Sequence, residues 1–485
     1  MKKIIEIIKK KWLRDTIYTT LLISVLVLGF IALNMWVSTL EVTNLDFTEE
    51  KLYTLSDESK ELVKNIDKDI TIYFVNFADT SLPVTIAKQY KEANEKISTE
   101  TVIASERKDI AALYGIEDDY TVVIIIKSGE KEKILVESDL YSYDESTWET
   151  IDISEQKMTN AILDVTSDEK PTIYFLTGHE EYTTSSQMMT MGAYIQNEVM
   201  EISDLNLLST DIPEDCQTIV IATPSTDFYD SEVEKLTAYI NRGGNIIWMQ
   251  DPTITDLELP NVQKILDLYG LSFHKGVIFE QDSNRMIMEN PQMILPTISY
   301  STITEDLSSS GYVVFASPGK MGIAESEKLE ELNVTVEEIL TTSESAFYRT
   351  NFELESASAQ ESDEVGIFTL GAILKKDVTK EEAEETIESK LIAFSSNIFA
   401  TDATVAAGNQ YITLATMYNN KDLVLNSIAY TEEKEDQIRI RKNYESVTYT
   451  PTQTQNNIVL AIIFGTPLLI VIAGIVLWQV RRRRK

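Results

Sequence analysis

Two long stretches without a charged residue stand near the two ends of the chain. Residues 17–37 read IYTTLLISVLVLGFIALNMWV, and residues 458–480 read IVLAIIFGTPLLIVIAGIVLWQV. A helix of about 20 apolar residues is long enough to cross the hydrocarbon core of a bilayer. Both stretches are therefore predicted to be transmembrane helices, over residues 17–39 and 458–480. The first is too long for a signal-peptide core and no small-residue cleavage site follows it, so we expect an uncleaved anchor.

Residues 40–168 alternate between strand and helix patterns. The predicted strands are 69–77, 98–104, 120–127 and 132–137, and the predicted helices are 84–97, 109–114 and 154–166. Their order, β-α-β-α-β-β-α, resembles that of the thioredoxin fold. The redox Cys-x-x-Cys that would follow the first strand is missing, because residues 76–84 read NFADTSLPV. We therefore expect a thioredoxin-like domain that lacks redox cysteines.

Residues 169–445 are predicted to form a larger α/β domain. Strand patterns at 171–177, 201–207, 215–224 and 245–252 alternate with helix patterns at 193–200 and 231–241. Such alternation is typical of a parallel sheet with right-handed crossovers. The Arg-Gly-Gly at 242–244 is expected to end the second of these helices.

The rest of this domain has a weaker pattern. Residues 283–364 are rich in Ser, Thr and Glu and are predicted to be an irregular insertion. Regular patterns return at 365–376 and 389–400, and the acidic residues 377–388 between them are expected to form a solvated loop or hairpin tip. A helix at 419–430 and a final strand at 437–442 follow, and residues 446–457 form a linker to the second transmembrane helix.

Polar residues follow the predicted strands of the larger domain. In a parallel α/β sheet, ligands bind beyond the carboxyl ends of the strands. Here those ends carry a cluster of candidate ligand- or partner-contact residues: Thr177, Gly178, His179, Glu180, Glu181, Ser225 and Asp251. A histidine among carboxylates is suited to hold a cation or to move a proton. The alternative is a structural histidine that fixes the loop after its strand, with Asp251 in a strand-terminating turn. We favour this structural role, or a role in ligand contact, over catalysis.

Several kinds of chemistry are excluded or disfavoured by the residues present. The chain has no G-x-x-x-x-G-K-[ST] loop for nucleotide phosphates. Its one cysteine, Cys216, precedes a predicted strand and so lies a sheet's length from His179, which disfavours a thiol hydrolase. With two histidines and one cysteine, a Cys- or His-based metal site is unavailable. We therefore expect no metal, no cofactor and no catalytic residues.

The charge distribution predicts how the chain lies in a membrane. The formal net charge is -36, yet residues 1–16 and the last five residues, RRRRK at 481–485, are basic. Basic flanks mark the cytoplasmic side of membrane helices, so both termini are expected in the cytoplasm and the central region outside the cell membrane. An ectodomain this acidic repels nucleic acid, which is excluded as a partner.

Several stretches, taken in order, resemble a known family. They are LDFTEEKLYTLSDESKELVKNI, YFLTGHEE, INRGGNIIWMQDP, VEEILTTSESAF, AFSSNIFA and NNKDLVLNSIAY, closed by an apolar span and a basic tail. The chain is similar to the auxiliary proteins of gliding-motility-type ABC transporters, whose ectodomains resemble amidotransferase-like α/β domains without catalytic residues. The family's TGHGE reads Thr177 to Glu181 here, TGHEE, so one glycine is lost.

The resemblance implies a non-catalytic, membrane-anchored auxiliary subunit of an ABC transport system. Its expected partners are an ABC permease subunit in the membrane, a cytoplasmic ATPase indirectly, and membrane lipid; gliding does not follow from the resemblance. Two alternatives stay open. One is an extracytoplasmic sensor or scaffold, and the other is a cell-surface hydrolase that uses His179, Glu180 and Asp251.

Overall fold

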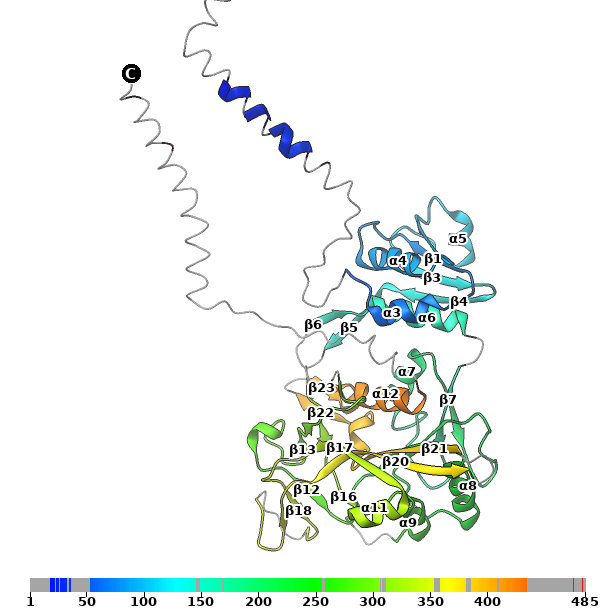
Figure 1. The fold of residues 1–485 in the computed structure, drawn as a ribbon, viewed down its shortest axis with the longest axis vertical. Helices are drawn as coiled ribbons and strands as arrows, with labels where there is room; N and C mark the ends of the chain where they lie inside the picture. Colours follow the sequence, from blue (N-terminus) through cyan, green and yellow to red (C-terminus); the bar gives the residue numbers. More distant parts are fainter. Residues whose placement is uncertain are drawn as a thin grey trace, which may run out of the picture. The chain divides into compact units, whose positions relative to one another are not determined.

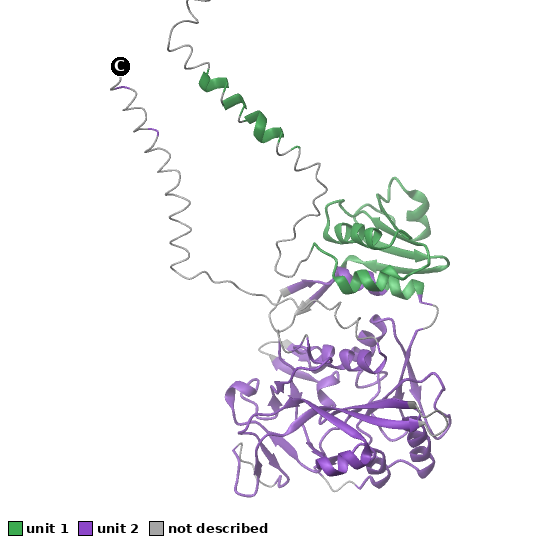
Figure 2. Cartoon of the chain, in the orientation of Figure 1, with its two compact units in different colours: residues 1–137, 161–166 green, residues 138–160, 167–485 purple. Residues whose placement is uncertain are grey.

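The computed structural model of the chain is a mixed α/β fold over the residues that it describes (Figure 1). The structure describes residues 18–21, 23–25, 27–32, 35, 53–144, 149–167, 170–254, 258–305, 307, 311–352, 358–380, 385–407, 410–433, 474 and 482. The chain divides into two compact units, residues 1–137 with 161–166 and residues 138–160 with 167–485 (Figure 2). The predicted mixture of helices and strands is thus confirmed.

The described residues cover the first predicted membrane span in part and the second at a single position. Of the span 17–39, residues 18–21, 23–25, 27–32 and 35 are described and are helical, and of the span 458–480 only residue 474 is described. Within the described part of the chain, no helix is both long enough and apolar enough to cross a membrane. The linker 446–457 and the predicted strand 437–442 also lie outside the described residues.

The first unit is built on a four-stranded sheet in the order β2-β1-β3-β4. Its strands are β1 (Ile70–Val75), β2 (Ile97–Val102), β3 (Val123–Ser128) and β4 (Lys131–Val136). β1 runs parallel to β2 and antiparallel to β3, and β3 runs antiparallel to β4. The turn between β3 and β4 contains Gly129 at φ +61°, a conformation that glycine adopts without strain.

Helices α3 (Asp57–Lys64), α4 (Leu82–Ala93) and α5 (Lys108–Leu113) belong to this unit. α3 begins where the Ser56 hydroxyl accepts a hydrogen bond from the amide of Ser59, 3.1 Å away, and α4 has a proline in its first turn. Ile110 and Ala111 of α5 pack on the sheet residues Val75, Val102 and Ile125. The division between the units crosses α6 (Ser154–Thr166), and η1 (Glu137–Leu140) is likewise divided.

The second unit contains a mixed eight-stranded sheet in the order β14-β17-β20-β21-β10-β9-β7-β8. Five of these strands are parallel neighbours: β8 (Glu201–Leu205), β7 (Thr172–Leu176), β9 (Thr218–Ala222), β10 (Asn245–Met249) and β21 (Glu385–Phe394). β9 and β10 are buried at every position, as expected for central parallel strands covered on both faces.

The prediction of a parallel sheet is wrong for the other three strands. β20 (Thr369–Lys380), β17 (Val334–Thr341) and β14 (Thr297–Ile298) each run antiparallel to their neighbour. For β20 the physical reason is the connection: β20 and β21 pair residue for residue from Gly371–Phe394 to Lys380–Glu385, so they form a hairpin. A short connection of this kind forces antiparallel strands.

Helices cover both faces of this sheet. On one face, α7 (Met189–Asn197) and α12 (Asn420–Thr431) pack on inward residues that include Phe175, Met249 and Phe394. On the other face, α8 (Asp230–Asn241) and α9 (Pro260–Asp267) pack on Trp248 and its neighbours. Successive strand residues point to opposite faces, and the two cores follow from this alternation.

Residues 283–364 differ from the irregular insertion that the sequence suggested. They contain η2 (Ser283–Arg285) and helix α11 (Ser326–Leu332), besides β14 and β17 of the main sheet. Short strands complete the segment and its surroundings: β11 (Leu271–His274) pairs with β16 (Lys320–Ile323), β13 (Met293–Ile294) with β15 (Phe315–Ala316), and β18 (Phe347–Arg349) with β12 (Val277–Phe279) and β19 (Glu364–Val365). Strands of two to four residues are too short to show a period in the sequence.

The remaining small elements also lie in the second unit. β5 (Tyr141–Asp144) pairs with β6 (Glu149–Asp152), and β22 (Thr404–Ala407) pairs with β23 (Gln410–Thr413). Two short 3-10 helices, η3 (Ile398–Ala400) and η4 (Leu414–Thr416), follow β21 and β23.

The Arg-Gly-Gly sequence ends α8 as predicted. Gly243 has φ +90°, and a Cβ added to Gly244 would lie 2.3 Å from the ring of Tyr239. The first glycine reverses the chain and the second lets β10 begin directly against the last turn of the helix.

Candidate functional site

The loop after β7 and the loop after β9 meet, as the sequence predicted. The carbonyl of His179 accepts a hydrogen bond from the amide of Ser225, 2.8 Å away, and the amide of Tyr182 donates to the carbonyl of Ala222 at 3.0 Å. Thr177 extends the pairing with β8 by donating its amide to the carbonyl of Leu205. The structure therefore brings Thr177 to Glu181 and Ser225 together at the carboxyl ends of the parallel strands.

Two residues of the β7 loop have left-handed backbone conformations. Gly178 lies at φ +129° and Glu180 at φ +62°. A Cβ at Gly178 would approach the side-chain amide of Asn206 to 3.1 Å, so this glycine is needed for conformation and for space. Glu180 occupies the position where the resembling family has its second glycine, and the backbone keeps the glycine-like conformation there. Both residues are exposed.

His179 is closed off from solvent between two carboxylates. Its Nε2 lies 3.0 Å from Oε2 of Glu232 and its Nδ1 lies 3.3 Å from Oε1 of Glu181, and all three side chains are 1–2% exposed. Neither contact has the alignment of a good hydrogen bond. The ring also packs edge-on against Phe228, with centroids 4.9 Å apart.

The two carboxylates also hold the backbone around this ring. Oε2 of Glu181 accepts the amide hydrogen of His179 at 2.7 Å, and Oε2 of Glu232 accepts that of Tyr229 at 2.8 Å, where α8 begins. Burial raises the pKa of the Glu181 carboxyl. The geometry favours a structural histidine that joins the β7 loop to the start of α8. Sequence reasoning missed Glu232, although a glutamate at the third position of a helix is a capping signal.

Asp251 connects the ends of three strands. Its Oδ1 accepts hydrogen bonds from the amides of Asn397, at 2.6 Å, and Ile398, at 3.0 Å, and so caps η3 after β21. Its own amide donates to the hydroxyl of Thr223, at the end of β9, at 3.0 Å. Burial raises the pKa of the Asp251 carboxyl, although these amide hydrogen bonds oppose the shift. The carboxylate is occupied in holding the strand ends together.

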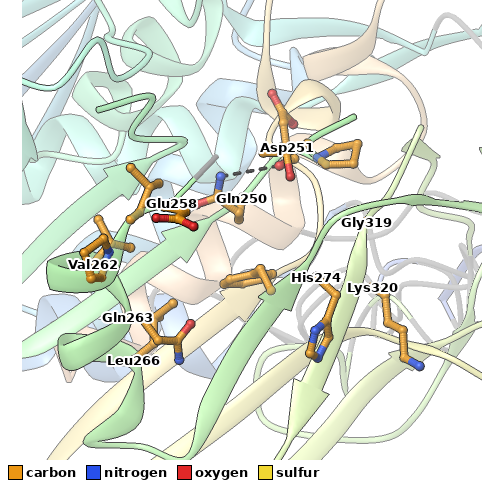
Figure 3. Close-up of a pocket in the computed structure, with 14 residues that line it drawn as sticks. Gln250, Asp251, Glu258, Val262, Gln263, Leu266, His274, Gly319 and Lys320 are labelled. Carbon is orange, nitrogen blue, oxygen red and sulfur yellow. Dashed lines mark hydrogen bonds between the residues drawn. The ribbon is translucent and has the colours of Figure 1, made fainter. Parts of the chain in front are cut away.

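A cavity of about 360 Å³ opens beyond the end of β10 (Figure 3). The segment after β10, helix α9 and the antiparallel strand pair β11–β16 form its walls. Of the residues predicted from the sequence, only Asp251 lines it. Sequence reasoning missed the other polar lining residues, which are Gln250, Thr253, Glu258, Gln263, His274 and Lys320. No local pattern marks them, because they come from four separate elements.

The described residues support neither a metal site nor a reactive cysteine. Across them, no group of three or more His, Cys, Asp or Glu side chains is arranged to hold a metal ion. Cys216 precedes β9 and is buried, at the opposite end of that strand from Thr223. Burial raises the pKa of its thiol to about 12, so the reactive thiolate is suppressed.

One of three comparisons with known proteins identifies a family. The sequence model of a family described as "ABC-type uncharacterized transport system" matches residues 170–427. Among solved structures, the chain is similar to one described as "mmIFT52 N-terminal domain", with a TM-score of 0.38 and 13% identity over 53% of this chain and 96% of that one. The comparison with curated proteins found no match. Since the matched segment is more than half of the chain, this protein belongs to the ABC-type uncharacterized transport system family, which is named for auxiliary components of ABC transport.

Proposed function

We propose that this protein is a non-catalytic auxiliary subunit of an ABC transport system, anchored in the cell membrane by both ends of the chain. The observation that carries the proposal is the family match over residues 170–427, which covers most of the second unit. The two uncharged stretches at 17–39 and 458–480, each with a basic flank, support the anchoring. Both termini then lie in the cytoplasm, and the central region lies outside.

The absence of a catalytic role is supported by how the strand-end residues are used. His179 is enclosed by Glu181, Glu232 and Phe228, and Asp251 caps η3. A general base must reach the proton that it removes, and an enclosed ring does not reach a substrate. The hydrolase alternative loses its main residues on this ground. Gly178 and Glu180, which are exposed, are the better candidates for contact with a partner.

We extend the proposal to the fold of each unit. The first unit has the order β2-β1-β3-β4 with β3 antiparallel to its neighbours, and this order supports a thioredoxin-like domain without redox cysteines. In the second unit, the parallel strands β8-β7-β9-β10-β21 between two helical layers support an amidotransferase-like domain. Its antiparallel strands are then an addition to that core.

The proposed partner in the membrane is a separate permease subunit, with the ATPase reached only through it. The chain has no nucleotide-binding loop of the G-x-x-x-x-G-K-[ST] kind, so another subunit supplies the energy. Gly465 and Gly474 in the second span permit close helix packing against a partner. The outer units then present a surface to a substrate or partner of the transporter.

Co-purification from membranes tests this role. We expect the full-length chain to bring down a permease and an ATPase, identified by mass spectrometry. A chain whose residues 458–480 are replaced by a polyleucine span of equal length keeps the anchor, and we expect it to lose the permease. Recovery of neither subunit with the intact chain contradicts the transport role and favours a sensor or scaffold. If both chains recover the permease equally, only the proposed contact through the second span is contradicted.

A further inference from the structure

The cavity beyond β10 has the size of a small-molecule site. Its volume is about 360 Å³, within the range of roughly 300–1,000 Å³ that ligand pockets span. It lies wholly within the second unit, and none of the interactions that enclose His179 uses it. Half of its fourteen lining residues are polar, so the cavity combines an apolar wall with groups that can orient a ligand.

The apolar wall is part of the rigid core. Val262 and Leu266 of α9 are 4% and 2% exposed and belong to the buried cluster around Trp248. Leu259 and Phe273 are partly buried and pack against the same cluster. A wall fixed by core packing does not need to be ordered when a ligand arrives, so less of the binding free energy is lost.

The positive groups of the lining are compensated or neutral. The Lys320 amine forms an ion pair with Glu364 and lies 5.1 Å from the ring centre of Tyr348. In Figure 3 its side chain runs away from Gln250 and Glu258. Burial, and after it the nearby Lys320 charge, lower the pKa of His274, so this ring is uncharged near neutral pH.

The acceptors of the lining remain available. The Gln263 side-chain nitrogen donates to Oδ1 of Asp267 and to the carbonyl of Leu271, both at 2.8 Å, which leaves its Oε1 as an acceptor. The Glu258 side chain is exposed, and its carboxylate makes no ion pair or hydrogen bond with another residue in the described ranges. The cavity is therefore rich in acceptors, and Glu258 supplies a carboxylate with no positive partner among the described residues.

We propose that this cavity binds an organic cation, an amine joined to an apolar body. The amine donates to the Glu258 carboxylate and to Oε1 of Gln263, and the apolar body lies on Leu259, Val262 and Phe273. The aromatic ring of Phe273 adds attraction for a cation. The net charge of -36 raises the concentration of cations near the surface and lowers that of anions. The proposal does not depend on the transport role.

The site is tested by titrating phenethylamine into the full-length protein in a neutral detergent. Binding is detected by ligand-observed NMR, with empty micelles as the blank. We expect saturable binding that Glu258→Gln weakens by about three- to tenfold, the worth of one charge-assisted contact at a partly exposed site. Glu234→Gln, an exposed charge on α8, is the matched control and leaves the affinity unchanged. Phenylacetate has a similar shape and the opposite charge, and we expect no saturable binding of it.

Three results would overturn the proposal: no saturable binding of phenethylamine, equal binding of phenylacetate, or equal affinity in the Glu258→Gln protein. A short peptide with one lysine between alanines then identifies the source of the cation. If the peptide displaces phenethylamine at lower concentration than free amines do, the cation is a side chain of a partner protein. If free amines displace it first, the cation is a small molecule, and both results support the same site.

Discussion

Nε2 of His179 lies 3.0 Å from Oε2 of Glu232, and this contact joins the loop after β7 to the first turn of α8. Both side chains are almost fully buried, and the same carboxylate oxygen also caps the helix by accepting from the amide of Tyr229. His179, which the sequence suggested as a site residue, thus makes a buried contact that holds two elements of the fold together. Glu181 contacts the other nitrogen of the His179 ring and encloses it from the opposite side.

We expect a double-mutant cycle on His179 and Glu232 to show strong coupling. The changes are His179→Ala, Glu232→Ala and the two together. Each single change leaves a buried polar group without its partner, so each is expected to lower the free energy of unfolding by about 2–4 kcal/mol. The double change should cost less than the sum, with a coupling of about 1–3 kcal/mol. Urea unfolding of the full-length protein, followed by tryptophan fluorescence, measures the cycle.

Glu234→Ala on the same helix is the control and should change stability little, because its side chain is exposed. Additive effects of the two single changes would contradict the interaction between His179 and Glu232.

Asp251 should make stability depend on pH in a particular direction. Burial raises its folded-state pKa above the usual value of 3.8, so the folded protein holds the proton more tightly than the unfolded chain does. As the pH falls through the folded pKa, this group therefore adds stability. An Asp251→Asn protein lacks the titration but keeps an oxygen to accept from Asn397 and Ile398. We expect wild type to gain stability relative to Asp251→Asn between neutral pH and about pH 4.

Urea unfolding of both proteins across that pH range provides the measurement. Asp251→Ala, which removes the acceptor, should be less stable than Asp251→Asn at every pH. A stability difference between wild type and Asp251→Asn that stays constant with pH would argue against a raised pKa.

Arg349 and Asp363 form a buried ion pair, and we expect the removal of one partner alone to destabilise the protein. Nη2 of Arg349 lies 2.7 Å from Oδ2 of Asp363, with both side chains 2% exposed, and the guanidinium lies over the rings of Phe279 and Phe347. Asp363→Ala removes the carboxylate that compensates the charge of the buried guanidinium, and it is expected to cost about 3–5 kcal/mol of stability. Replacing both residues, as Arg349→Met with Asp363→Leu, should recover much of that loss.

Thermal unfolding of the three proteins checks this prediction. The hydrogen bond from Arg349 lowers the pKa of Asp363, so its stabilisation is present above the usual carboxyl pKa and is lost as the pH falls through the lowered one. A single-site variant as stable as wild type would show that the pair contributes nothing.

Gly244 should not tolerate a side chain. An added Cβ would lie 2.3 Å from the ring of Tyr239, which is itself fixed by hydrogen bonds to the carbonyls of Gln217 and Asn245. Gly244→Ala is therefore expected to lower the free energy of unfolding by about 1–3 kcal/mol through overpacking. Gly366→Ala is the matched control, because nothing lies within 4 Å of its added Cβ. Equal stability of the two variants would contradict the close approach at Gly244.

Much of the secondary structure was predictable because its signals are local. The helix expected at 154–166 is α6 with the same bounds, and the hairpin across Gly129 and the helix stop at Gly243 are also confirmed. Capping residues, glycines and hydrophobic periods act within a few positions, so the sequence displays them directly. The predicted position of Cys216, before β9 and away from the strand-end loops, is confirmed for the same reason.

The errors came where distant segments had to be placed. β20 pairs with both β17 and β21, and each pairing depends on which edge of a strand is free. A strand pattern in the sequence does not show whether that strand runs parallel or antiparallel to its neighbour. The candidate site was likewise predictable in part. The sequence placed Thr177 to Glu181, Ser225 and Asp251 at strand ends, but whether a side chain there is enclosed depends on partners such as Glu232 and Asn397 from other elements.

The sequence by itself determined the alternation of strands and helices, the absence of a nucleotide loop and of paired cysteines, the basic ends beside uncharged stretches, and the motifs of the family. These properties belong to residue types and short spacings, which folding does not alter. Only the tertiary structure decided the strand order, the enclosure of His179 and the cavity beside Glu258. Burial and charge compensation depend on side chains brought together from separate elements, and that information becomes visible only when the chain is packed.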